Sequence, residues 1–177
     1  MSNIVYIGVS IDGFIADRDN KIDFLEIVDN PNNDDLGFND FIERIDAIVM
    51  GRNTFETVLS FNIDWPYQKP VFVCSTKLKE SPPSLINKVF IINKNPKDIV
   101  SYLNNKGFNN LYIDGGNNIQ NFLSEDLIDE MVISRIPVLL GSGVPLFNYL
   151  PKHLEFKVEK VDLLLNQIVS TTYIRKK

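Results

Sequence analysis

Residues 46–56 read Asp-Ala-Ile-Val-Met-Gly-Arg-Asn-Thr-Phe-Glu, and this stretch decides the fold class. Its four consecutive apolar residues, 47–50, predict a strand that is buried on both faces. A helix over residues 53–59 follows directly, and Asn53 with Glu56 three positions later resembles a capping box at its start. A buried strand that runs into a helix in this way indicates an α/β protein.

The same alternation of apolar runs and helical stretches extends along the chain. We expect strands at 3–9, 45–50, 70–75, 88–93, 110–113, 129–137, 154–162 and 167–175, and helices at 36–43, 53–59, 96–105 and 117–124. Strands alternate with helices at first and then follow one another. This order predicts a mixed sheet with helices on both faces and an antiparallel C-terminal edge. Because there is no repeat or linker, we expect a single domain over residues 1–177.

Composition and charge restrict the class of partner. Hydrophobic residues make up 44% of the chain and charged residues 23%, which is typical of a globular protein. The net charge of −5 argues against nucleic acid or an anionic membrane as the main partner. Cys74 is the only cysteine, so an internal disulfide is excluded, and we expect a reducing, cytoplasmic environment. No cluster of Cys and His has metal-ligand spacing, and we expect no metal site.

Three predicted strands end in residues that suit phosphate. These ends are Gly51-Arg52-Asn53-Thr54, Ser75-Thr76-Lys77 and Asp114-Gly115-Gly116-Asn117-Asn118. Two of them lead into helices, whose first N–H groups and positive dipole ends attract anions. Each feature alone is an ordinary cap or turn. Together, on one edge of one sheet, they predict a dinucleotide site, and Lys77 with its neighbouring hydroxyls suits the 2′-phosphate of NADP.

Gly141-Ser142-Gly143 looks like the start of a second dinucleotide motif. Pro145 follows, however, and a proline there prevents the immediate helix that such a motif needs. We therefore expect a tight turn between strands at this point.

Several of these segments carry a family resemblance. Residues 46–56 resemble the Met-Gly-Arg-x-Thr-aromatic-Glu signature of dihydrofolate reductases. Residues 4–16 and 114–147 are similar to the C-terminal reductase domain of bifunctional riboflavin-biosynthesis deaminase-reductases. The resemblance covers nearly the whole chain in the right order. It implies the dihydrofolate reductase-like fold, with a central eight-stranded mixed sheet and helices on both faces, together with NADPH as cofactor and a homodimer.

The resemblance also implies roles for particular positions. Gly51, Arg52, Asn53 and Thr54 would meet the pyrophosphate, and Ser75, Thr76 and Lys77 would meet the adenosine ribose and its 2′-phosphate. Gly115, Gly116, Asn117, Asn118 and Ile119 would lie along the pyrophosphate and the nicotinamide ribose, and Ile7, Gly8, Ile15 and Ala16 would line the nicotinamide.

The substrate side is predicted from fewer signals. Asp35 stands in the place of the dihydrofolate reductase acid and is our candidate proton donor, although Asp34 and Asp35 equally suit the N-terminus of a helix. Phe24 and Phe38 are candidate walls for a flat heterocyclic substrate, with buried packing as the alternative. Where riboflavin reductases carry Glu before Gly-Gly, this chain has Asp114.

The sequence thus predicts an NADPH-dependent reductase of a small heterocycle, most like 5-amino-6-(5-phosphoribosylamino)uracil reductase. Two alternatives remain open, namely dihydrofolate reductase activity and a dinucleotide-binding regulatory protein that does not catalyse a reaction.

Overall fold

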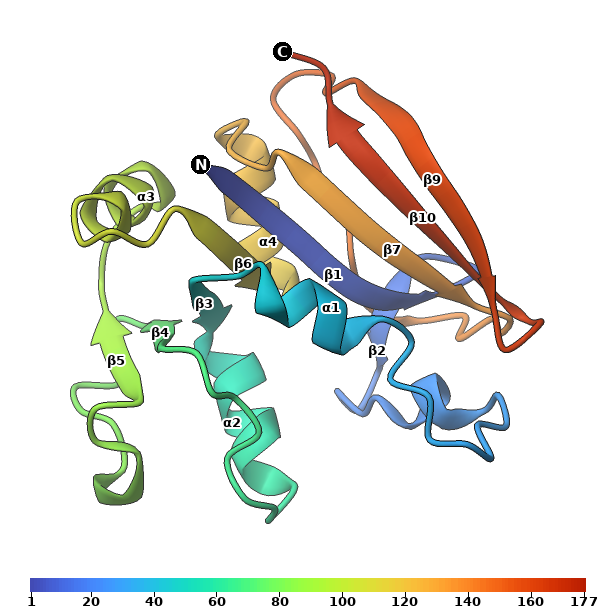
Figure 1. Ribbon diagram of the computed structural model, residues 1–177, viewed down its shortest axis with the longest axis horizontal. Coiled ribbons are helices and arrows are strands. Elements are labelled where there is room, and N and C mark those ends of the chain that lie inside the picture. The colour runs from blue at the N-terminus through green and yellow to red at the C-terminus, as the bar shows by residue number, and fades with distance from the viewer.

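The computed structural model describes residues 1–177, and a single eight-stranded mixed sheet organises it (Figure 1). The strand order is β5-β4-β3-β6-β1-β7-β10-β9. The strands are β1 (Ser2–Ser10), β3 (Ala47–Gly51), β4 (Val71–Cys74), β5 (Val89–Ile92), β6 (Asn110–Asp114), β7 (Glu130–Ile136), β9 (Phe156–Leu164) and β10 (Ile168–Arg175). The first six strands in this order are parallel, and β10 pairs antiparallel with both β7 and β9. The predicted mixed sheet with an antiparallel C-terminal edge is confirmed.

Helices cover both faces of this sheet, as predicted. They are α1 (Phe38–Glu43), α2 (Arg52–Ser60), α3 (Pro96–Asn104) and α4 (Gly116–Ser124), with 3-10 turns η1 (Asp23–Glu26) and η2 (Pro83–Leu85). Figure 1 shows α1 in front of the sheet and α4 behind it. None of these helices is long and apolar enough to cross a membrane.

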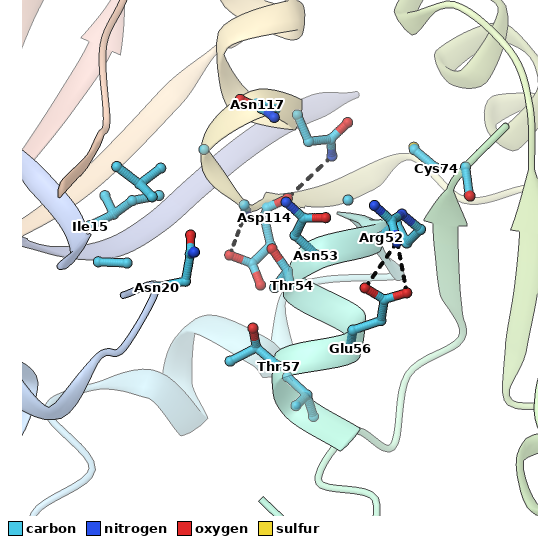
Figure 2. A pocket seen from close by; sticks show the side chains of 18 of the residues that line it. Ile15, Asn20, Arg52, Asn53, Thr54, Glu56, Thr57, Cys74, Asp114 and Asn117 are labelled. Carbon is cyan, nitrogen blue, oxygen red and sulfur yellow. Dashed lines mark hydrogen bonds and ion pairs between the residues drawn. The ribbon is translucent and has the colours of Figure 1, made fainter. Parts of the chain in front are cut away.

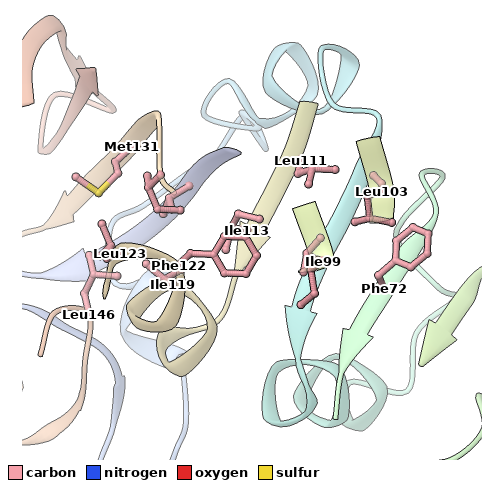
Figure 3. Close-up of a cluster of buried hydrophobic side chains, with 14 of the residues drawn as sticks. Phe72, Ile99, Leu103, Leu111, Ile113, Ile119, Phe122, Leu123, Met131 and Leu146 are labelled. Carbon is pink, nitrogen blue, oxygen red and sulfur yellow. The ribbon is translucent and has the colours of Figure 1, made fainter. Parts of the chain in front are cut away.

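The two faces have separate cores because side chains alternate along each strand. On β3, Ala47 and Val49 belong to a cluster of 17 buried residues that also includes residues of α3 and α4 (Figure 3). Ile48 and Met50 belong instead to a cluster of 11 that includes Phe55 of α2. This strand is therefore buried on both faces, as its apolar run predicts.

A second, two-stranded sheet lies beside the main one and is only partly anticipated by the sequence. It pairs β2 (Phe14–Asp17) with β8 (Gly143–Pro145) in antiparallel fashion. The expected tight turn between strands is present at Gly141, whose φ is +73°, although the strand that follows it, β8, is not among the predicted strands. The Gln120 side chain of α4 donates to the Pro145 carbonyl at 2.8 Å, which ties this small sheet to the helix.

Two local expectations are wrong. The helix α2 begins at Arg52 with Gly51 as its N-cap, so Asn53 lies inside the helix and caps nothing; Glu56 instead pairs with Arg52 at 3.0 Å. The strand-rich sequence of 129–147 also predicts an exposed sheet edge that a second copy of the chain would cover. Its strand β7 lies between β1 and β10, so the open edges belong to β5 and β9.

Candidate functional site

A cleft of about 1140 Å³ opens where the parallel strands end (Figure 2). One wall is formed by the ends of β3, β4, β5 and β6 and by α2, and the other includes residues of β1, β2 and the segment 19–25. Figure 2 shows Asp114 and Thr54 on the first side, with Ile15 and Asn20 opposite them. The cleft therefore crosses most of the parallel part of the sheet.

The order of the strands places a crevice at the middle of this cleft. From β3 the chain proceeds outward to β4 and β5, and it then returns to form β6 on the other side of β3. The carboxyl ends of β3 and β6 thus form a topological switch point, where open α/β sheets bind their ligands. The register pairs Met50 with Asp114, so α2 and α4 both start at this point.

The two helices that begin here have free N-termini. Neither Gly51 before α2 nor Gly115 before α4 provides a side-chain cap. In α3, by contrast, the Asn95 side chain accepts a hydrogen bond from the N–H of Asp98. Uncapped first-turn N–H groups and two positive dipole ends side by side form a site for an anion.

The loops that lead into α2 and α4 are held against each other. The Asn118 side chain in α4 donates to the Val49 carbonyl of β3 at 2.9 Å. Gly115 has φ of +87°, and a Cβ at this position would lie 2.2 Å from Oγ1 of Thr54. Only glycine fits there, because a side chain would be strained and would also collide with α2.

Positive charge gathers at the β4–β5 end of the cleft. Lys77 follows β4 and Lys94 follows β5, and both line the cleft. The Ser75 hydroxyl accepts from the backbone N–H groups of Lys77 and Leu78 at 3.1 and 2.9 Å, which fixes the shape of this loop. Arg52 is partly neutralised by Glu56, so the two lysines carry the local positive charge.

One carboxyl group in the cleft has an altered affinity for protons. Asp114 ends β6, and burial raises its pKa from 3.8 to about 6, against a hydrogen bond from the N–H of Gly115 that lowers it. One of its oxygens accepts the N–H of Gly115 at 2.8 Å. Such a group is partly protonated near neutral pH, which is the property that a proton donor needs.

The structure brings most of the predicted cofactor residues together. Fifteen of the sixteen line the cleft, namely Ile7, Gly8, Ile15, Ala16, Gly51, Arg52, Asn53, Thr54, Ser75, Thr76, Lys77, Gly115, Gly116, Asn117 and Asn118. Ile119 does not. Its side chain is fully buried in the 17-residue core because it lies on the sheet-facing side of α4.

The predicted substrate residues lie outside the cleft. The carboxylate of Asp35 accepts the N–H groups of Gly37 and Asn39 at 3.0 and 2.8 Å at the start of α1, and these bonds lower its pKa. Phe24 is buried with Ile136 and Ile168 in a small cluster under η1. Phe38 packs edge-on against Tyr6. For all three, the structure agrees with the alternative reading of helix terminus or core packing.

Other lining residues were not identified from the sequence. Tyr67 and Tyr112 line the cleft beside Asp114, and Asn20, Lys21 and Lys94 lie further along it. The sequence identifies Asp114 only as part of a phosphate-type strand end and as the residue in place of the Glu of riboflavin reductases. Its position directly before Gly-Gly at a strand end was the available signal, whereas nothing local marks Tyr67.

The strand order and the cleft at its switch point define the dihydrofolate reductase-like class of α/β domain. The chain belongs to the RibD C-terminal domain family, whose model matches residues 3–170.

Individual relatives agree with this assignment. A putative riboflavin biosynthesis protein from Shewanella sp. PV-4 is 56% identical, with a TM-score of 0.97 over 100% of both chains. The uncharacterised protein YwjB of Bacillus subtilis is 35% identical over 174 residues, 97% of each chain. Acinetobacter baumannii RibD has the same fold, with a TM-score of 0.71 at 20% identity over 99% of this chain and 58% of that longer one. The chain is thus a riboflavin-biosynthesis reductase-like domain.

Proposed function

We propose that the protein is an NADPH-dependent reductase of a small heterocyclic substrate, most like 5-amino-6-(5-phosphoribosylamino)uracil reductase. One observation carries this proposal. Two uncapped helix N-termini meet at the switch point of the sheet, inside a cleft that extends from Ile7 and Gly8 on β1 to Lys94 after β5. Membership of the RibD C-terminal family supports it.

The residues present fit a dinucleotide with an extra phosphate. The glycine at position 115 keeps the centre of the cleft open to backbone N–H groups, which would hold a pyrophosphate together with Arg52 and Thr54. Thr76 and Lys77 would hold the 2′-phosphate through charge-assisted hydrogen bonds. When bound, the dinucleotide supplies a hydride to a C=N or C=O carbon.

The chain's own part in the chemistry is to position the substrate and provide a proton. Asp114 can hold a proton on the oxygen that does not accept from Gly115, because its raised pKa keeps a fraction of the carboxyl protonated near neutral pH. It would deliver this proton to the nitrogen or oxygen of the reduced bond. Ile15, Ile22 and Leu25 on the opposite side reduce the access of water.

NADPH oxidation, followed by absorbance, tests the proposal with 5-amino-6-(5-phosphoribosylamino)uracil and dihydrofolate supplied in parallel. We expect turnover of the first compound. Turnover of dihydrofolate alone would assign the protein to the alternative reductase activity. Tight NADPH binding without turnover of any heterocycle would favour the regulatory alternative.

A further inference from the structure

Tyr67 is fixed in the wall of the cleft by a row of aromatic rings. Its ring meets that of Trp65 edge-on at 5.3 Å, and Trp65 meets Phe55 of α2 at 5.8 Å. Side chains in such packing have little freedom to change rotamer. The hydroxyl of Tyr67 therefore keeps one position relative to α2.

This hydroxyl differs from those of the two neighbouring tyrosines. Tyr6 donates to the Leu36 carbonyl at 2.8 Å, and Tyr112 donates to the Tyr6 carbonyl at 3.0 Å. The Tyr67 hydroxyl has no hydrogen-bond partner in the chain and lines the cleft. The oxygen is open to the cleft, so a ligand that covers it must supply a hydrogen-bond partner, because a buried hydroxyl without one is costly.

Asp114 lies in the same part of the cleft. Burial and the charge of Asp114 both raise the pKa of Tyr67, so its hydroxyl stays protonated and acts as a donor. The wall of the cleft at this point therefore presents a phenol donor beside a carboxyl group. A planar ring with two polar atoms along one edge could form one hydrogen bond with the Tyr67 hydroxyl and another with the Asp114 carboxyl group.

We propose that Tyr67 is a specificity-determining residue, whose hydroxyl donates a hydrogen bond to an acceptor atom on the edge of the substrate ring next to Asp114. The inference rests on the proposed function and narrows it. The substrate presents a lactam-type edge to this wall, and a ring without an acceptor there is rejected because Tyr67 is left unpaired. Sites that hydrogen-bond a substrate discriminate strongly against analogues that lack the matching group.

The test compares Tyr67→Phe with Tyr6→Phe, which removes a hydroxyl that is satisfied outside the cleft. Trp65 is the only tryptophan and packs on Tyr67, so its fluorescence reports ligand binding. We expect Tyr67→Phe to raise the Kd for 5,6-diaminouracil roughly tenfold without lowering the melting temperature. Tyr6→Phe should lower the melting temperature and leave this Kd unchanged, and both variants should bind NADPH as the unmodified protein does.

An unchanged Kd in Tyr67→Phe would overturn the inference, and so would a failure of the unmodified protein to bind 5,6-diaminouracil. The titration needs neither cofactor nor turnover. If the Kd for 5,6-diaminouracil depends on Tyr67 but no heterocyclic substrate supports NADPH oxidation, the role of Tyr67 is supported and the proposed reductase function is contradicted.

Discussion

At the scale of single residues, Asp114 and Asp35 place two carboxyl groups in opposite environments. Asp114 has a pKa raised to about 6 by burial within the cleft. Asp35 is exposed, and hydrogen bonds from Asn39 and Gly37 lower its pKa. At pH 6 about half of the Asp114 side chains carry a proton, whereas Asp35 is ionised. Only Asp114 combines a proton with access to the cleft.

We therefore predict that kcat/KM falls as the pH rises above about 6, because the protonated form of Asp114 is then lost. Asp114→Asn should lower kcat roughly 100-fold or more and remove this limb of the pH profile. Asp35→Asn is the matched control and should keep both the rate and the profile. Steady-state NADPH oxidation across the pH range measures these effects. A large loss of rate in Asp35→Asn, with Asp114→Asn unaffected, would instead identify Asp35 as the proton donor, as in dihydrofolate reductases.

At the scale of elements, the connection between β6 and α4 joins the chemistry to the fold. Gly115 has a backbone conformation with φ of +87° and touches the first turn of α2. Gly107 has nearly the same φ, +90°, but a Cβ there would meet nothing within 4 Å. Alanine substitutions at Gly115 and Gly107 therefore separate the cost of backbone strain, which both share, from the cost of a steric clash, which only Gly115 has.

We predict that Gly115→Ala destabilises the protein by more than about 2 kcal/mol, whereas Gly107→Ala costs about 1 kcal/mol. Urea unfolding of both variants measures the difference. Adding Thr54→Ala to Gly115→Ala should restore part of the lost stability, since it removes the Oγ1 that lies 2.2 Å from the new Cβ. Equal losses in the two single variants would show that the contact with α2 is unimportant.

The elements also show what the sequence can and cannot predict. The parallel strands were recognisable because burial on both faces leaves continuous apolar runs such as 47–50. The strands β2 and β8 were missed because they have only four and three residues and pair across the chain. The predicted capping box is wrong because Gly51, in an extended conformation, is the N-cap and the helix begins at Arg52, one residue before Asn53.

In the candidate site, too, the features that the local sequence determines are predictable and those that depend on distant residues are not. The phosphate-type strand ends were predictable, because glycines and hydroxyls mark them locally. The raised pKa of Asp114 was not, because the burial that causes it requires residues distant in sequence, such as Tyr67, to pack around β6. Ile119 could have been assigned to the core from its spacing with Phe122 and Leu123, which places all three on one side of α4.

At the scale of the whole molecule, the net charge of −5 means that the overall field does not attract a dinucleotide. Affinity must come from local groups such as Lys77. We predict that Lys77→Ala raises the Kd for NADPH about tenfold and leaves that for NADH unchanged, because a charge-assisted bond to the 2′-phosphate is lost. Lys79→Ala, at an exposed position outside the cleft, is the control in a fluorescence titration. Equal effects on both cofactors would contradict a 2′-phosphate site at this loop.

The far end of the sheet carries an apolar surface that a monomer would leave in water. On β9 and β10, Val158, Val161, Leu163 and Val169 are 57%, 59%, 61% and 43% exposed. Leu163 is directly opposite Val169, so the two side chains share a face of the sheet, and Val161 lies on the same face two positions away. Exposed apolar groups gathered in this way mark interaction surfaces. We propose a second copy of the chain as the occupant, since identical patches can meet across a two-fold axis.

This proposal predicts a homodimer that dissociates when a single charged side chain is introduced into the apolar surface. Val161→Glu should give a monomer in light scattering, because burying the carboxylate in an apolar interface is costly. Lys160→Glu changes the adjacent residue, which points to the opposite face and pairs there with Asp162, and it should leave the dimer intact. Because the cleft lies at the ends of the parallel strands and includes no residue of β9 or β10, NADPH binding should be the same in both variants. A protein that remains monomeric at every concentration before any substitution would refute the prediction.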